Sequence, residues 1–291
     1  MSGTSTFTPR RSVLYMPGAN TRALEKARTL PADALILDLE DAVAPDAKDA
    51  AREQAVQAVK DGGFGRRELV IRVNGADTPW GEADLRAAAA ARPDAILVPK
   101  VNSAADVAAY SAPLDAGTDL WAMIETGRSI FNVEGIAAAS ATSRLTTFVM
   151  GTNDLAKETR ARITPGREPF HAALSLAVMA ARIHGLTILD GVHNDIEDPN
   201  SLEAICRQGV DFGFDGKTLI HPKQIDICNL VFSPAPAEVE FARAVIAAFA
   251  LPENQGKGAI RVEGKMAELL HLEQSKRLVA VAEAIREAEA A

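Results

Sequence analysis

The chain contains, at residues 34–60, the stretch ALILDLEDAVAPDAKDAAREQAVQAVK. Its first part, Ala34–Leu39, is almost continuously apolar, which predicts a strand buried on both faces. From Asp46 to Lys60 the apolar residues recur at helical spacing, so an amphipathic helix is expected after the strand. A strand followed by a helix is the repeating unit of a parallel α/β sheet.

The same alternation continues along the chain and predicts eight such units. Eight units favour closure into a (β/α)₈ barrel, the TIM-barrel fold, with a doubly wound open sheet as the alternative. We expect a catalytic barrel domain over residues 1–232 and a C-terminal helical extension over residues 233–291. The extension includes a strand-like run at Ala259–Val262 between two helices. The predicted barrel strands are Ser12–Met16, Ala34–Leu39, Leu69–Val73, Ala95–Val98, Leu120–Ile124, Leu145–Met150, Leu186–Leu189 and Phe212–Phe214.

Composition and charge exclude several classes of function. The 291 residues include 31 Lys and Arg against 39 Asp and Glu, a formal net charge of −8. This balance disfavours binding to nucleic acid or to anionic membranes, because both need a basic surface. No apolar run is long enough to span a bilayer, and the N-terminus does not resemble a signal peptide. With two cysteines, Cys206 and Cys228, we expect free thiols and a cytoplasmic protein.

Acidic side chains follow most of the predicted strands. The carboxyl ends of barrel strands meet on one rim, where barrel enzymes carry their active sites. Carboxylates without His or Cys suit Mg²⁺, so Glu125 and Asp154 are the candidate metal ligands, and Glu40 and Asp41 could hold metal-bound water. Two other interpretations stay open: Asp154 could cap a helix, and Glu40 and Asp41 could form a solvated loop. The acids at predicted strand ends are Glu40, Asp41, Glu125, Asp154, Asp190 and Asp215.

Arg72 lies inside a predicted apolar strand, where an unpaired guanidinium would be very costly. It could form a structural ion pair with Glu40 or Glu125, or it could bind a substrate carboxylate through two hydrogen bonds. Residue types alone leave these alternatives open. A metal beside Arg72 would suit an α-keto or α-hydroxy acid whose carbonyl is polarised.

Several basic residues and histidines are weaker candidates. Arg11 and Lys217 could meet phosphate groups at the rim, although a solvated surface explains each of them equally well. His221 precedes Pro222 at the start of a predicted helix and is expected to be a cap or loop contact. His193 follows a predicted strand and could face the rim.

Seven motifs occur in order along nearly the whole chain and carry a resemblance to a known family. Together they resemble the citrate lyase β-subunit-like family of the HpcH/HpaI aldolase superfamily. The stretches LWAMIET (120–126), MGTNDLAKE (150–158) and ARIHGLTILDG (181–191) are most similar to the malyl-CoA lyase and (3S)-malyl-CoA thioesterase branch. The seven motifs are RSVLYMPG (11–18), DLEDAV (38–43), VIRVN (70–74), IET (124–126), GTNDLA (151–156), GFDGKTLIHPKQ (213–224) and the Gly-containing segment 256–264.

The resemblance implies a Mg²⁺-dependent barrel enzyme that acts on acyl-CoA thioesters as a homotrimer or homohexamer. It implies that Glu125 and Asp154 bind Mg²⁺, with Glu40 and Asp41 supporting the water molecules of the metal. Arg72 would bind the carboxylate or carbonyl oxygens of the substrate, and Arg11 and Lys217 would lie near the CoA channel. The C-terminal segment would cap the site of a neighbouring subunit. The residues assigned to catalysis are Arg72, Glu125 and Glu268, and those assigned to substrate binding are Arg72, Glu125, Arg11 and Lys217.

One departure from the family pattern concerns Glu268. Lyases of the family often place an Asp four residues after a Gly as the acid/base group, and this chain has Glu268 after Gly264. The extra methylene moves the carboxylate by about 1 Å, enough to slow a geometrically demanding step. We therefore expect hydrolysis of (3S)-malyl-CoA, or of a close 3-hydroxy-dicarboxylyl-CoA, to malate and CoA.

Three other activities stay open at this point. The first is C–C cleavage of malyl-CoA or citramalyl-CoA to a 2-oxo acid and acetyl-CoA. The second is a citrate lyase β subunit that acts on an acyl-carrier-protein thioester. The third, disfavoured by the motif set, is a metal-dependent aldolase that acts on free hydroxy-keto acids.

Overall fold

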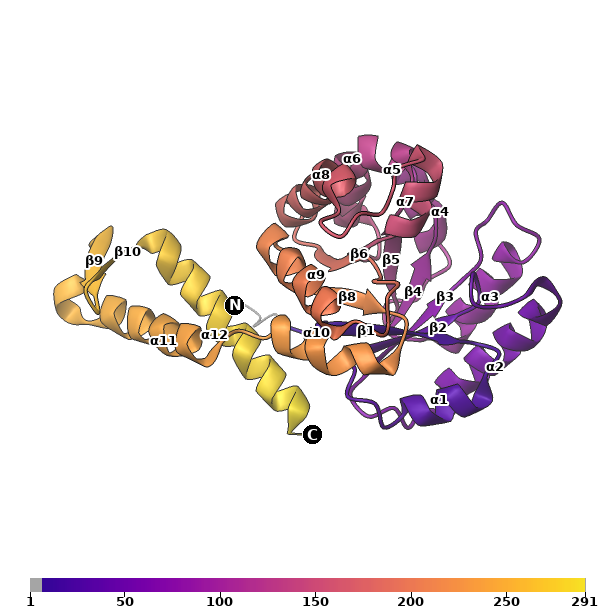
Figure 1. Cartoon of the computed structure of the whole chain (residues 1–291), viewed down its shortest axis with the longest axis horizontal. Coiled ribbons are helices and arrows are strands. Elements are labelled where there is room, and N and C mark those ends of the chain that lie inside the picture. Colours follow the sequence, from indigo (N-terminus) through magenta and orange to yellow (C-terminus); the bar gives the residue numbers. More distant parts are fainter. Residues whose placement is uncertain (1–6, 291) are drawn as a thin grey trace. The chain divides into compact units, whose positions relative to one another are not determined.

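The computed structural model describes residues 7–290. These residues form two compact units. Residues 10–232 form one unit, and residues 233–290 together with 7–9 form the other. In the first unit, eight parallel strands pair in chain order, and β8 pairs with β1, so the sheet closes into a barrel (Figure 1). The predicted (β/α)₈ fold is confirmed. The barrel strands are β1 (Ser12–Pro17), β2 (Ala34–Asp38), β3 (Glu68–Arg72), β4 (Ala95–Val98), β5 (Asp119–Ile124), β6 (Leu145–Met150), β7 (Thr187–Asp190) and β8 (Gly216–Leu219).

Helices connect the strands and surround the barrel (Figure 1). Asn20 and Ser103 are the N-caps of the first and fourth of these helices, because each side chain accepts a hydrogen bond from the first turn of its helix. The barrel helices are α1 (Thr21–Ala27), α2 (Lys48–Asp61), α3 (Gly81–Ala91), α4 (Ala104–Ser111), α5 (Gly127–Phe131), α6 (Val133–Ala138), α7 (Thr152–Thr159), α8 (His171–Ile183), α9 (Pro199–Phe212) and α10 (Ile225–Val231). Short 3₁₀ turns lie at Pro45–Ala47, Ala139–Thr142, Glu168–Phe170 and Pro222–Gln224.

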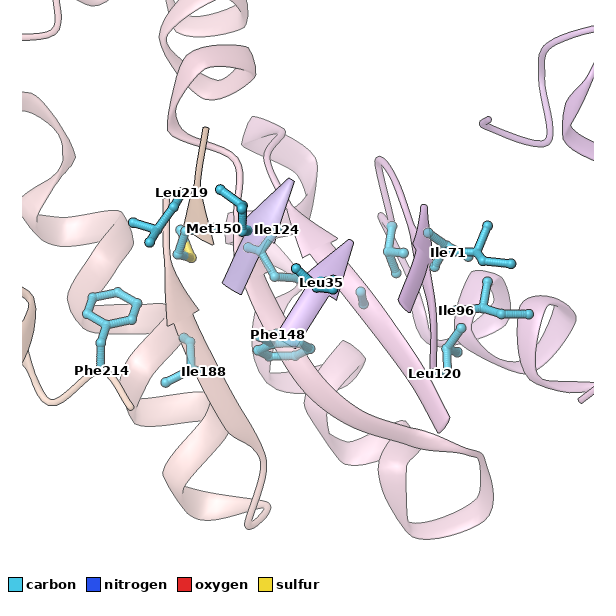
Figure 2. Packing of buried hydrophobic residues seen from close by; sticks show 14 of the residues in the cluster. Leu35, Ile71, Ile96, Leu120, Ile124, Phe148, Met150, Ile188, Phe214 and Leu219 are labelled. Atoms are coloured by element: carbon cyan, nitrogen blue, oxygen red, sulfur yellow. The ribbon is translucent and has the colours of Figure 1, made fainter. Parts of the chain in front are cut away.

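The continuous apolar runs of the strands reflect two separate layers of core. One set of strand side chains, including Leu35, Ile71 and Phe148, packs outward in a large cluster that also contains helix residues (Figure 2). The alternate set, including Val70 and Trp121, fills the barrel interior. Since successive side chains of a strand point to opposite faces, each strand residue can be assigned to the interior or the outer layer by its position.

The predicted strand at Phe212–Phe214 is wrong. Phe212 is the last residue of α9, Gly213 ends that helix in the left-handed conformation (φ +94°), and the strand is β8, at 216–219. Phe214 instead packs in the outer core cluster (Figure 2). Asp215 therefore precedes the strand at its amino end, where Arg182 binds both of its carboxylate oxygens, at 2.8 and 2.9 Å. It is not one of the acids of the carboxyl rim.

A buried arginine closes the amino end of the barrel. The Arg10 guanidinium bonds Glu68 of β3 at 2.6 Å and the hydroxyls of Thr147 and Thr187 at 3.2 and 3.1 Å. It also lies over the Trp121 ring, 5.0 Å from the centroid. These contacts fill the amino end of the barrel, whereas a cavity opens at the carboxyl end.

The second unit is a helical hairpin with a small two-stranded sheet. Helix α11 (Pro236–Ala250) is followed by a 3₁₀ turn at Pro252–Asn254, the antiparallel strands β9 (Ala259–Val262) and β10 (Lys265–Glu268), and helix α12 (Leu269–Glu289). The sequence predicted β9 and both helices but not β10. Among residues 7–290, no helix combines the length and apolar character needed to cross a bilayer.

We expect Gly216→Ala to lower the free energy of unfolding by about 1–3 kcal/mol, the range for overpacked interiors. A Cβ at this position would lie 1.8 Å from the carbonyl oxygen of Arg10, so backbone would have to move at the β1–β8 seam. Urea denaturation measures the change. Gly117→Ala is the control, because its Cβ would have no neighbour within 4 Å, and it should stay within about 0.5 kcal/mol of the parent. An equal decrease in the free energy of unfolding of the two variants would contradict the close packing of Gly216 against the backbone of Arg10.

Candidate active site at the carboxyl end of the barrel

A cavity of about 280 Å³ opens at the carboxyl ends of the barrel strands. Its lining combines apolar side chains, such as Met123 and Met150, with a small number of charged groups. This combination is typical of binding sites for small molecules. The charged residues that line it are Asp38, Asp41, Arg72 and Asp154.

Arg72 lies at the end of β3 with its side chain in the barrel interior, 6% exposed. Its main partner is Asp38 of β2, whose two oxygens accept hydrogen bonds of 2.6 and 2.7 Å. Glu40 and Asp41 meet the remaining terminal nitrogen at 2.9 and 3.3 Å. The guanidinium also stacks over Tyr15, 4.7 Å from the ring centroid. Arg72 is therefore held in one orientation by three carboxylates and a ring.

Asp38 lies at the end of a predicted strand but was given no role from the sequence, although it is the acid that organises this side of the site. Besides Arg72, it accepts hydrogen bonds from the backbone N–H groups of Glu40 and Ala42, at 2.9 and 3.0 Å. It thus orients both the guanidinium and the loop that carries Glu40. Its position in β2 was the available signal, because alternation from Ala34 and Ile36 points Asp38 into the barrel.

Glu125 follows β5 and is the most enclosed acid of the site, at 1% exposure. Burial, together with the charges of Glu40 and Asp154, raises the pKa of Glu125 to about 8. Its Oε1 accepts a 2.7 Å hydrogen bond from the backbone N–H of Lys100, a residue in the left-handed conformation (φ +51°). On the other side its Oε2 would lie 2.4 Å from a Cβ at position 151, so only Gly151 leaves room for this carboxylate.

Asp154 lies in the first turn of α7 and lines the cavity. It is not the N-cap of this helix, because that position is Gly151. The structure thus brings Arg72, Glu40, Asp41, Glu125 and Asp154 to one rim. Within residues 7–290, no group of three or more His, Cys, Asp or Glu side chains has a metal-binding arrangement. Two carboxylates nevertheless suit Mg²⁺, which takes one or two from a protein and completes its shell with water or substrate oxygens.

A buried lysine supports the loop after β2. Lys48 is 6% exposed, and its Nζ donates to the carbonyl oxygens of Leu39 and Glu40 and to Oδ1 of Asn74, at 2.8, 2.6 and 2.8 Å. All three ammonium donors are therefore used. Asn74 in turn donates to the fully buried Asp84 at 2.6 Å. No sequence signal marks Lys48, because a lysine on an amphipathic helix is usually solvated.

Two other predicted site residues, Arg11 and Lys217, lie away from this cluster, and a third, Glu268, belongs to the second unit. Arg11 precedes β1 at the amino end of the barrel and pairs with Asp33 at 2.9 Å. Lys217 of β8 shares the outward face of its strand with Leu219, and it is fully buried against Asp190, 3.0 Å away. Glu268 ends β10 in the second unit, and its backbone N–H donates to His271 Nδ1 at 2.9 Å.

The two histidines take part in local contacts. His221 caps the 3₁₀ turn before α10, since its Nδ1 accepts from the backbone N–H of Lys223, as expected for a cap. His193 bonds Ser201 Oγ at 2.9 Å and is absent from the lining of the main cavity.

Comparison with known proteins assigns the family. The model of the HpcH/HpaI aldolase/citrate lyase family matches residues 11–222. The chain belongs to this family. It is 53% identical over 277 residues to a (3S)-malyl-CoA thioesterase of Cereibacter sphaeroides (strain KD131 / KCTC 12085), with 95% of this chain and 96% of the relative covered. An L-malyl-CoA/beta-methylmalyl-CoA lyase of the same strain is 34% identical over 306 residues, with the same coverage.

Solved structures agree with this assignment. The protein CitE from Mycobacterium tuberculosis, in complex with magnesium, acetoacetate and coenzyme A, matches with a TM-score of 0.77 and 29% identity. The match covers 94% of this chain and 97% of that one. The family resemblance stated from the motifs is confirmed.

We expect Asp38→Asn to lower the free energy of unfolding by about 2–3 kcal/mol, because the buried Arg72 loses a charged partner. Chemical denaturation of the two proteins measures this difference. Glu82→Gln is the matched control, since its ion pair with Arg86 is exposed (86% and 75%) and should contribute less than about 1 kcal/mol. A loss no larger than that of the control would refute the structural role of Asp38.

Proposed function

We propose that this protein is a Mg²⁺-dependent thioesterase that hydrolyses (3S)-malyl-CoA to malate and free CoA. The observation that carries the proposal is the 53% identity to a (3S)-malyl-CoA thioesterase along 95% of the chain. The carboxylate-rich rim beside Arg72 suits this substrate, which combines a carboxylate, a hydroxyl and a thioester carbonyl.

Glu125 and Asp154 are the proposed Mg²⁺ ligands. Their chemistry fits the ion, because burial and then the charges of Glu40 and Asp154 raise the pKa of Glu125, and a cation would offset this unfavourable environment for the carboxylate. Mg²⁺ complexes of the related CitE support the same choice. When bound, the ion would supply Lewis-acid polarisation of a substrate carbonyl. Gly151 and the Lys100 N–H hold Glu125 in place for this role.

Arg72 is proposed to bind the carboxylate or carbonyl oxygens of the substrate. Its rigid pairing with Asp38 means that little conformational freedom is lost when a substrate binds. Glu40 and Asp41, which already contact Arg72, would accept hydrogen bonds from water molecules in the site. The roles of Arg11 and Lys217 near CoA stay predictions. Both residues are engaged in buried ion pairs, so any contribution would require these pairs to adjust.

Glu268 is the proposed acid/base group, contributed by the C-terminal unit of one subunit to the barrel of a neighbour in a homotrimer or homohexamer. Glu268 is the last residue of β10 in the β9–β10 hairpin, and the end of a small hairpin is a suitable position for a side chain that reaches another subunit. We also propose a cytoplasmic location, because both cysteines, Cys206 and Cys228, are free thiols.

The second candidate function is reversible cleavage of malyl-CoA to glyoxylate and acetyl-CoA. It is favoured by the 34% identity to L-malyl-CoA/beta-methylmalyl-CoA lyases, which covers 95% of this chain. The two reactions share a substrate and differ in the products, so one assay separates them.

We expect the purified chain to release free thiol and malate from (3S)-malyl-CoA in the presence of Mg²⁺. In EDTA the rate of this hydrolysis should fall by at least about 100-fold. Free thiol, glyoxylate and acetyl-CoA are followed together. Glyoxylate formed in step with acetyl-CoA would identify the lyase instead. No turnover of malyl-CoA would remove both candidates and leave another acyl group or a carrier-protein thioester.

We expect Glu268→Asp to raise C–C cleavage relative to hydrolysis by about 10-fold or more, because the shorter side chain withdraws the carboxylate by about 1 Å. The ratio of glyoxylate to free thiol measures the change. Glu273→Asp, on an exposed side chain of α12, makes the same chemical change as a control. An unchanged ratio in the Glu268 variant would remove the argument that this residue selects the reaction.

A further inference from the structure

A second cavity, of about 190 Å³, lies beside the active-site cavity. The two cavities share Thr152 and Val192 in their linings, so they are immediate neighbours. The second cavity is built from the start of α7, residues 163–167 and the loop after β7. It is smaller than the active-site cavity, so it suits a small molecule or ion.

A buried cluster with an excess of positive charge adjoins this cavity. Arg167 donates to both oxygens of Asp190 at 2.7 and 2.9 Å, and Lys217 donates to the same carboxylate at 3.0 Å. The side chains of Arg167, Asp190 and Lys217 are 6%, 0% and 0% exposed. Burial alone would raise the pKa of Asp190, but the charges of Lys217 and Arg167 hold it below its usual range. Two cations therefore meet one anion where water is excluded, an arrangement that favours a further negative charge.

One donor of this cluster has no partner. The Nε of Arg167 donates to Gln208 at 2.7 Å and its Nη1 to Asp190, whereas its Nη2 is buried without a hydrogen-bond acceptor among residues 7–290. Buried donors of this kind are rare in native proteins and indicate a missing partner. Arg167 is also a lining residue of the second cavity. It reaches this place through a left-handed backbone conformation (φ +56°), which is uncommon outside glycine and frequent at functional sites.

The positive field extends to the cavity wall. His193 lines the cavity, and burial and then the charge of Lys217 lower its pKa. Asp195 also lines the cavity and opposes this field, but its carboxylate already accepts from the backbone N–H groups of Glu197 and Asp198 at 2.9 and 3.2 Å. Asp195 is exposed to solvent, so water screens its charge more than that of the buried cations.

We propose that this cavity is a second ligand site, which binds a small oxyanion of phosphate or carboxylate chemistry through the Arg167 guanidinium, whose Nη2 lacks an acceptor in the described part of the chain. An oxyanion supplies the acceptor that Nη2 lacks and balances the excess charge of the cluster. Planar guanidinium edges are well suited to both groups. None of the charged residues of this site belongs to the Arg72 cluster, and its ligand is a small anion distinct from the proposed thioester substrate.

An amide pair links the walls of the two cavities. Asn153 lines the main cavity next to Asp154, Asn194 lines the second, and their side chains exchange two hydrogen bonds, of 3.1 and 2.9 Å.

The test is a thermal shift of the full chain with sodium phosphate and, separately, sodium malate, each against sodium chloride at equal ionic strength. EDTA is present throughout, so that malate is not recruited to the main cavity by metal. At a ligand concentration about ten times Kd, Tm should rise by roughly 2–4 °C. A rise with phosphate alone identifies a phosphoryl ligand, and a rise with malate alone identifies a carboxylate.

Two matched variants locate the binding. Ile163 lines the cavity and is 49% exposed, so Ile163→Glu places a tethered carboxylate there without disturbing the core, and the ligand-dependent rise should disappear. Ile183→Glu makes the same change on an exposed position of α8 outside this cavity (71% exposed), and it should keep the rise. The proposal is overturned if neither anion raises Tm of the parent chain, or if Ile163→Glu responds as the parent does.

Discussion

The bidentate pair between Asp38 and Arg72 is the interaction on which the site depends. Both side chains lie inside the barrel at the ends of adjacent strands, where an isolated charge of either sign would be unstable. Each charge is tolerated because the other is present. The same carboxylate fixes the backbone of the following loop through two N–H groups. One buried acid thereby orients the guanidinium and positions Glu40 and Asp41 around it, and Lys48 secures this loop from the opposite side.

Most of the fold could be predicted from the sequence because strands buried on both faces leave continuous apolar runs. The exception is instructive. Strand β8 has the sequence GKTL, and its lysine is stabilised only by a tertiary partner, Asp190, which no local pattern reveals. The preceding Phe212-Gly213-Phe214 is more apolar, but the left-handed Gly213 makes it a helix end. Tertiary ion pairing therefore outweighed local hydrophobicity at this strand.

The candidate site was predictable to the extent that strand ends could be recognised. Glu40, Asp41, Arg72, Glu125 and Asp154 follow or end apolar runs, and they do lie on one rim. The alternation along β2 could have placed Asp38 inside the barrel, but its pairing with Arg72 is visible only once β3 lies beside β2. Lys217 was assigned to the rim because the strand before it was misplaced. With β8 placed correctly, the alternation of strand residues puts Lys217 in the outer layer, beside Asp190 and Arg167.

The arginine that closes the floor of the barrel has a consequence for how the chain folds. Arg10 joins β3, β6 and β7, with partners 58, 137 and 177 residues away along the chain. Such contacts form only after most of the chain has assembled, since the cost of closing long loops must be met first. We therefore expect these hydrogen bonds to be absent from the folding transition state. These hydrogen bonds would then slow the unfolding of the finished barrel. They would contribute little to the rate of folding.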